Sequence, residues 1–292
     1  MSVKPTRESA NEKWYALEVI LTPEAREAVE YGLMEAGAGG TETITERNGE
    51  LCVIAYFDAP PERALVRAAL HEALRIYSLP SGAVGEMRMR KVEGRDWLAE
   101  WKKNWQPVSV GERFIIAPPW SATSAAPEQI VIRIEPGMAF GTGTHETTRL
   151  CLAAIEKHFR GGSFLDVGTG TGILAIAAAK LFPGIDIEAC DTDPEAIVIA
   201  RENARLNSVS EGIRFFVGTV DETLRSADCV CANLTADIIL PLLPALVGAT
   251  CGRLILSGIL DAQASVVRAG LRELGIEEGE ITTDGEWIAV VV

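Results

Sequence analysis

The segment that most constrains the fold of this chain is residues 163–182, where an apolar strand runs into a glycine-rich turn and then into a helix. The strand ends in Phe164-Leu165-Asp166-Val167, and the turn is Gly168-Thr169-Gly170-Thr171-Gly172. Glycines are needed where the backbone turns sharply and a ligand lies against it, because a Cβ would occupy the ligand's volume. Gly168 and Gly170 are therefore candidate ligand-binding residues. Dinucleotide sites use the same device, so the turn alone does not identify the ligand.

Strands and helices alternate on both sides of this turn. Strands are expected at residues 130–134, 163–167, 186–190, 213–217, 227–231 and 253–257, and helices at 144–159, 172–182, 194–207, 236–247 and 262–274. This order predicts an α/β fold with a doubly wound parallel sheet that is covered on both faces. The last strands, 276–282 and 287–292, flank the turn signal Asp284-Gly285 and must be antiparallel. A parallel sheet that ends in a C-terminal antiparallel hairpin is typical of class I methyltransferases.

The N-terminal part of the chain has a different order of elements. A strand at 14–20 is followed by a helix to about residue 36, and two strands at 41–45 and 51–57 flank the turn signal Asn48-Gly49. A second helix begins at Pro60-Pro61, with apolar residues from Leu65 to Tyr77 spaced three and four apart, and residues 86–92 alternate as a strand. The order βαββαβ predicts a small ferredoxin-like α+β domain over residues 1–92.

Residues 93–128 are rich in tryptophan and proline, and we expect them to link this domain to a second one at 129–292. Two interpretations of Trp97, Trp101, Trp105 and Trp120 remain open. They could pack the joint between the domains, or some of them could line a cleft for substrate, because large amphipathic rings suit concave surfaces.

Charge and cysteine content exclude several classes of protein. A net charge of −14 makes direct binding of nucleic acid unexpected, because an acidic surface repels polyphosphate. The six cysteines have no zinc-like spacing, so we expect no metal site and interpret them as buried thiols in a reducing compartment. The polar N-terminus lacks a secretory signal, and the apolar run 238–251 is shorter than the roughly 18 to 20 residues that span a bilayer. A cytoplasmic protein without a membrane span is expected.

Polar residues follow two of the predicted strands. Asp191 comes 23 residues after Gly168, where a carboxylate accepts both hydroxyls of a ribose, so the ligand is expected to be a nucleoside. Asn233 ends the strand Val230-Cys231-Ala232, where side chains face the ligand crevice of a doubly wound sheet. Asn233 could instead be a turn residue or the N-cap of the next helix. Asp193, before Pro194, is most simply a helix cap.

A polar loop, Ala139-Phe140-Gly141-Thr142-Gly143-Thr144-His145-Glu146-Thr147-Thr148, precedes the first glycine-turn strand. Loops of this kind commonly close over ligands. Thr144 is a plausible N-cap for the helix that follows. His145 could act as a base, but a histidine that caps a helix or hydrogen-bonds is at least as consistent with its position.

With these elements in register, the chain resembles the class I S-adenosylmethionine-dependent methyltransferases and, more closely, the ribosomal protein L11 methyltransferase family. The resemblance covers nearly the whole chain and includes the segments Asp96-Trp97 to Pro107, Pro118-Pro119-Trp120, Phe140 to Thr148, Asp166 to Gly172, Asp191, Ala232-Asn233-Leu234, Ser257 to Leu260 and Glu286-Trp287. The resemblance implies that Thr148, Gly168, Asp191 and Asn233 hold S-adenosylmethionine. It also implies methylation of lysine side chains and the N-terminal amine of ribosomal protein L11, which the small domain would capture.

Members of the family often end in a basic tail, whereas this chain ends in the apolar residues Ala289-Val290-Val291-Val292. Tail contacts with ribosomal RNA are therefore not expected. Leu234-Thr235-Ala236 after Asn233 also differ from the Asn-Pro-Pro-Tyr signature of glutamine and adenine amino methyltransferases. Asn233 is the candidate residue for orienting the acceptor nitrogen. Three alternatives remain: a lysine methyltransferase acting on a different protein, a catalytically silent ribosome-assembly module, and a nicotinamide-dependent oxidoreductase, against which the GxGxG spacing and the terminal hairpin count.

Overall fold

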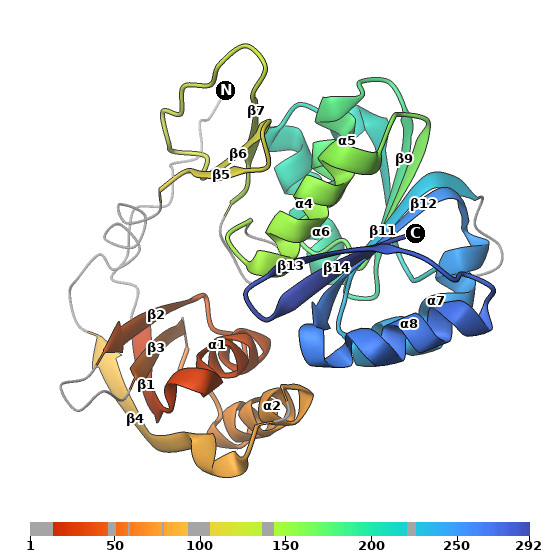
Figure 1. The fold of residues 1–292 in the computed structure, drawn as a ribbon. Coiled ribbons are helices and arrows are strands. Elements are labelled where there is room, and N and C mark those ends of the chain that lie inside the picture. The colour runs from red at the N-terminus through yellow and green to blue at the C-terminus, as the bar shows by residue number, and fades with distance from the viewer. Residues whose placement is uncertain are drawn as a thin grey trace, which may run out of the picture. The chain divides into compact units, whose positions relative to one another are not determined.

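The computed structural model of the chain describes residues 14–45, 51–57, 59–77, 79–92, 106–135, 143–220 and 226–292 (Figure 1). The chain divides into two compact units, residues 1–103 and 104–292. Several sequence expectations fall outside the described residues. They are the turn at Asn48-Gly49, the positions of Trp97, Trp101 and Trp105, and residues 139–142 of the polar loop.

The first unit contains a four-stranded antiparallel sheet in the order β2-β3-β1-β4. Its strands are β1 (Trp14–Leu21), β2 (Gly40–Thr45), β3 (Leu51–Phe57) and β4 (Val84–Val92). Two helices, α1 (Arg26–Glu35) and α2 (Arg63–Ile76), pack against each other. The three-and-four spacing on α2 buries Val66, Leu70, Ala73 and Leu74, whereas Leu65 is 62% exposed and does not belong to the buried face.

A three-stranded sheet begins the second unit, within the stretch expected to be a linker. It consists of β5 (Val108–Val110), β6 (Phe114–Ala117) and β7 (Ile130–Arg133), with β6 and β7 parallel. The expectation of a linker over 93–128 is therefore wrong for β5 and β6, because three residues in β5 give no period and the continuous apolar run of β6 does not alternate. The side chain of Asn207 connects this sheet to the rest of the unit, since its Oδ1 accepts from the backbone N–H of Arg133 at 2.9 Å.

The main sheet of the second unit has seven strands in the order β10-β9-β8-β11-β12-β14-β13. The first five in this order are parallel, whereas β14 is antiparallel to both of its neighbours. The bounds are β8 (Ser163–Val167), β9 (Asp186–Asp191), β10 (Ile213–Val217), β11 (Ala227–Asn233), β12 (Thr250–Leu260), β13 (Glu280–Asp284) and β14 (Trp287–Val291). Strands β9 and β10 lie on one side of β8 and β11 on the other, so the strand order reverses between β8 and β11. Ligands of doubly wound sheets bind at the carboxyl edge of such a switch point.

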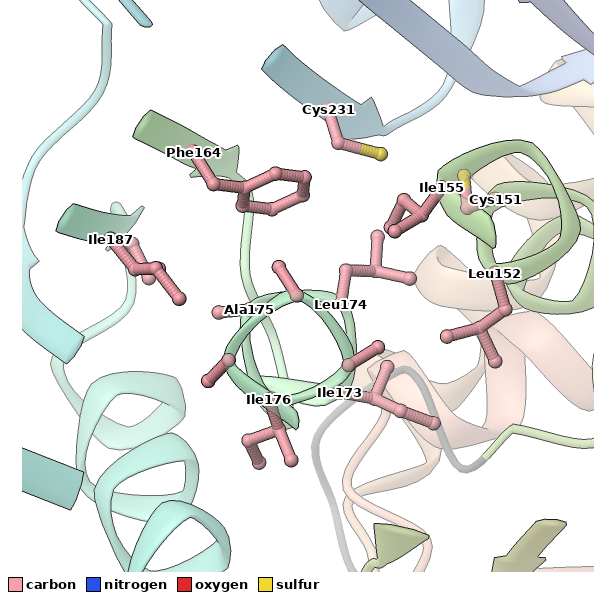
Figure 2. Packing of buried hydrophobic residues seen from close by; sticks show 14 of the residues in the cluster. Cys151, Leu152, Ile155, Phe164, Ile173, Leu174, Ala175, Ile176, Ile187 and Cys231 are labelled. Atoms are coloured by element: carbon pink, nitrogen blue, oxygen red, sulfur yellow. The ribbon is translucent and has the colours of Figure 1, made fainter. Parts of the chain in front are cut away.

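Helices cover both faces of this sheet (Figure 1). Phe164 and Leu165 are neighbours on β8 and belong to different buried clusters, because successive strand residues point to opposite faces. The cluster around Phe164 is covered by α4 (Glu146–His158), α5 (Ile173–Leu181) and α6 (Pro194–Leu206), and the other by α7 (Ala236–Gly248) and α8 (Ala264–Glu273). Figure 2 shows α5 end-on, with side chains of three strands on one side of it and Cys151, Leu152 and Ile155 of α4 on another.

Three local expectations need correction. The N-cap of α4 is His145 and not Thr144. Cys251 is exposed, while the other five cysteines are buried free thiols. Asp284 pairs with Trp287, so the turn between β13 and β14 is Gly285-Glu286, one residue later than expected.

Asp193 is confirmed as a cap, since its side chain accepts from the N–H of Glu195 at 2.8 Å. Within the described ranges, no helix is long and apolar enough to cross a membrane.

Candidate functional site

The glycine turn leaves β8 in a conformation that only glycine adopts readily. Gly168, Gly170 and Gly172 have φ of 71°, 53° and 80°. A Cβ on Gly168 would lie 2.4 Å from Cδ2 of Leu234, so space is also lacking there. The N–H groups of Gly168 and Thr169 both donate to the carbonyl of Cys190 at 2.9 Å. The turn is therefore held against β9 and lies in contact with the residue that follows β11.

Asp191 is the last residue of β9, and its carboxylate contacts the glycine turn directly. Its Oδ2 accepts from the N–H of Gly170 at 2.9 Å, and its Oδ1 accepts from the N–H of Asp193 at 3.0 Å. Each carboxylate oxygen has a further lone pair with which to accept a hydroxyl. The structure thus brings Gly168, Gly170 and Asp191 together at one edge of the sheet.

Asn233 is the last residue of β11 and pairs with Ser257 of β12. The N-cap of α7 is Thr235, which excludes the capping interpretation of Asn233. Among the described residues, its Oδ1 is one of three buried side-chain atoms without a hydrogen-bond partner. Leaving a buried acceptor unsatisfied costs about 1–3 kcal/mol, so such an atom at a carboxyl edge indicates a place for a ligand's donor.

Thr148 lies in the first turn of α4 and is fully buried. Its Oγ1 is another of the three atoms without a partner in the described part of the chain. Because α4 is joined to the start of β8 by a short turn, its N-terminus lies toward the opposite, carboxyl edge of the sheet. His145 caps this helix, since its Nδ1 accepts from the N–H of Thr147 at 3.2 Å. The capping interpretation of His145 is therefore confirmed.

Asp166 is a site residue that we did not identify from the sequence. It is fully buried on β8, and its Oδ2 accepts from Thr169 Oγ1 at 2.6 Å and from the N–H of Ala175 at 3.2 Å. Burial raises the pKa of this carboxyl to about 7, although both hydrogen bonds lower it. Its Oδ1 is the third buried atom without a partner within the described ranges. The available signal was an acidic residue inside the apolar strand Phe164-Leu165-Asp166-Val167.

These atoms test whether the chain fits the cofactor that the resemblance implies. A turn with three glycines at positive φ, a carboxylate beside it and the buried oxygens of Thr148 and Asn233 are features that a ribose-bearing ligand with polar groups would complete. The residues fit S-adenosylmethionine. Within the described residues, no group of three or more histidine, cysteine or acidic side chains could hold a metal ion.

Comparison with known proteins agrees with this geometry. The family model for ribosomal protein L11 methyltransferase (PrmA) matches residues 13–292. Curated relatives named ribosomal protein L11 methyltransferase, from Bacillus cereus (strain AH820) and Bacillus anthracis, are each 35% identical over 96% of this chain and 98% of the relative. The crystal structure of a ribosomal protein L11 methylase from Lactobacillus delbrueckii subsp. bulgaricus is similar, with a TM-score of 0.58 and 31% identity, over 64% of this chain and 97% of that chain. The chain therefore belongs to the ribosomal protein L11 methyltransferase family and is an S-adenosylmethionine-dependent protein methyltransferase.

Proposed function

We propose that this enzyme methylates ribosomal protein L11 on amine nitrogens, namely lysine side chains and the N-terminal amine. The names of its relatives support the protein substrate. The observation that carries the choice of an amine is the buried Oδ1 of Asn233, an acceptor without a partner among the described residues. An amine offers N–H donors to such an atom. Family membership excludes the nicotinamide-dependent alternative that the glycine turn alone left open.

In this proposal, Thr148, Gly168, Gly170, Asp191 and Asn233 hold the cofactor. Asp191 accepts the ribose hydroxyls with its remaining lone pairs, and the glycine turn lets the ligand approach the backbone. Thr148 Oγ1 gains the hydrogen bond that it lacks in the described residues. When bound, S-adenosylmethionine supplies an electrophilic methyl group on a sulfonium.

The protein's task at the acceptor is to present a lone pair on nitrogen. Keeping a lysine with a pKa near 10.4 neutral at pH 7 costs about 4.6 kcal/mol at roughly 1.36 kcal/mol per unit. Withdrawal from water favours the neutral amine, so no strong base is needed. Asn233 Oδ1 then accepts one N–H of the amine and fixes its direction, and this proximity contributes much of the rate.

We assign substrate recognition to the first unit, which we interpret as a ferredoxin-like domain over residues 1–92. We assign catalysis to the second unit, residues 104–292. Residues 111–292 carry 13 basic and 24 acidic side chains, a net charge of −11, which attracts a basic polypeptide and disfavours direct contact with nucleic acid. We assign the enzyme to the cytoplasm, because its proposed substrate is a ribosomal protein.

The experiment that tests the function is incubation of the purified protein with labelled S-adenosylmethionine and total ribosomal proteins, followed by mapping of the labelled residues. Label on lysines and the N-terminus of L11 is the expected result. Label on another protein would favour a different lysine methyltransferase. Cofactor binding without any label would favour a silent ribosome-assembly module.

The role of Asn233 has its own test. Asn233→Ala should reduce turnover at saturating cofactor by about 100-fold, the size expected when a positioned polar group is lost from a reacting centre. Asn233→Asp keeps an acceptor oxygen at the position of Oδ1 and serves as the conservative variant, with thermal unfolding as the control for folding. Unchanged turnover of Asn233→Ala under saturation would show that the acceptor is oriented by other groups.

A further inference from the structure

The guanidinium of Arg149 connects the start of α4 to the C-terminal hairpin formed by β13 and β14. Its Nε and Nη2 both donate to Asp284 Oδ2, at 2.9 and 2.7 Å. Its Nη1 donates to the carbonyl of Thr144 at 2.7 Å, and Nη2 also reaches Glu146 Oε1 at 3.2 Å. One planar side chain thus holds three separate groups, which a lysine at this position could not do.

A ring contact attaches the same segment to the hairpin at a second point. The imidazole of His145 meets the indole of Trp287 edge to face, with centroids 5.2 Å apart and planes at 64°. Trp287 is 3% exposed and is the residue paired with Asp284 across the hairpin. We name residues 144–148 the cap segment, because they contain the cap of α4, the residue before it and the first helical turn. The ring contact involves His145 of the cap segment, and the ion pair involves Arg149, the residue that follows the segment.

The hairpin is in turn continuous with the strand that carries Asn233. Trp287 pairs with Leu260 on β12, and the hydroxyl of Ser257 on the same strand donates to the carbonyl of Ile288 at 2.9 Å. Ser257 is the residue paired with Asn233. A connected series of contacts therefore runs from the cap segment through the hairpin and β12 to the end of β11. Its two ends carry Thr148 Oγ1 and Asn233 Oδ1, the two buried acceptors assigned above to the site.

We propose that Arg149 and Asp284 are positioning residues that hold the cap segment, and with it Thr148, in the geometry that binds the cofactor. This inference rests on the proposed role of Thr148 in the site. Thr148 is adjacent to Arg149 in the sequence, so a change in the start of α4 moves Thr148 directly. Neither Arg149 nor Asp284 needs to touch the cofactor for this effect.

The chain offers a matched control at the other end of the same helix. Lys157 and His158 in the last turn of α4 both pair with Glu280 on β13, the latter with Nε2 at 3.5 Å from Oε2. Glu280→Ala therefore removes a contact between the same helix and the same strand, but far along α4 from Thr148. The two acidic side chains to be replaced also have similar exposure, with Asp284 at 38% and Glu280 at 42%.

The experiment compares Asp284→Ala, Asp284→Asn and Glu280→Ala by calorimetric titration with S-adenosylmethionine, thermal unfolding and steady-state kinetics. Asp284→Ala should raise the Kd and the KM for the cofactor by about three- to tenfold while kcat at saturation changes less than twofold, since a charge-assisted contact of partial exposure is removed. Asp284→Asn, which keeps an acceptor oxygen, should show a smaller rise and guards against a failure of Asp284→Ala to fold. Glu280→Ala should leave the Kd and the KM unchanged.

Equal cofactor affinity in Asp284→Ala and Glu280→Ala, with the wild type binding normally, would overturn the positioning role. A loss of kcat and stability without any change in KM would also overturn it, because that pattern belongs to a general structural contact. Failure of the wild type itself to bind S-adenosylmethionine would instead contradict the proposed function, so the two failures are distinguishable.

Discussion

Replacing Asp166 by asparagine should remove a pH dependence of stability that this one carboxyl creates. The group is fully buried, and burial raises its pKa from the ordinary value of 3.8 to about 7. The folded protein therefore holds the proton to a higher pH than the unfolded chain does. Its stabilising contribution is complete below about pH 4 and is lost as the pH rises through about 7. A difference of about 3 pKa units corresponds to about 4 kcal/mol of unfolding free energy.

The asparagine variant is expected to keep the local hydrogen bonds, because its carbonyl oxygen can accept from Thr169 Oγ1 and the N–H of Ala175 in place of Oδ2. It has no proton to lose. The free energy of unfolding of Asp166→Asn, measured in urea without cofactor, should therefore rise relative to wild type by about 1.4 kcal/mol per pH unit between pH 5 and 7. Above pH 8 the difference should be constant.

Asp228→Asn provides a control of opposite sign. The pKa of Asp228 is lowered, first by the hydrogen bond from the backbone N–H of Ser163 and then by the one from its hydroxyl. Its contribution is present above the unfolded pKa and is lost as the pH falls, so this variant should lose stability at neutral pH. A difference between wild type and Asp166→Asn that stays constant from pH 5 to pH 8 would refute the reasoning.

Two further predictions concern steric strain at the glycine turn and cofactor binding by Thr148. Gly168→Ala should lower the Tm more than Gly184→Ala. Both glycines have a positive φ, 71° and 87°, at which a side chain costs about 1–2 kcal/mol. Only at Gly168 would the added Cβ also lie 2.4 Å from Leu234. Equal losses in thermal unfolding would contradict this. Thr148→Val removes a buried hydroxyl without a partner in the described residues, so the cofactor-free protein should be as stable as wild type or more so by about 1 kcal/mol. Calorimetry should nevertheless show a roughly tenfold weaker Kd for S-adenosylmethionine, and an unchanged Kd would exclude Thr148 from the site.

Local patterns in the sequence predicted much of the second unit. Short apolar runs and helical periodicity predicted the order of elements from β8 to β14. Burial of a strand on both faces gives a continuous apolar run, and burial of a helix on one face gives a repeat of three and four residues, so each signal lies within a single segment. The glycine turn and the cap at Asp193 could also be predicted from the sequence, because each depends on residues that are close together in the chain. Asp191 was placed beside the turn by its position at the end of a strand, and the structure shows its carboxylate on the N–H of Gly170.

Other features depend on partners that are distant in sequence, and no local pattern encodes them. Arg149 and Asp284 are 135 positions apart, and only the pairing of β14 with β12 brings the hairpin to the start of α4. The raised pKa of Asp166 requires knowledge of how completely α5 and the neighbouring strands exclude water from it. Residue types and their spacing along the chain thus determine which groups reach the carboxyl edge of the sheet. Burial and long-range contact, which exist only once the chain is packed, decide their charge and their exact neighbours.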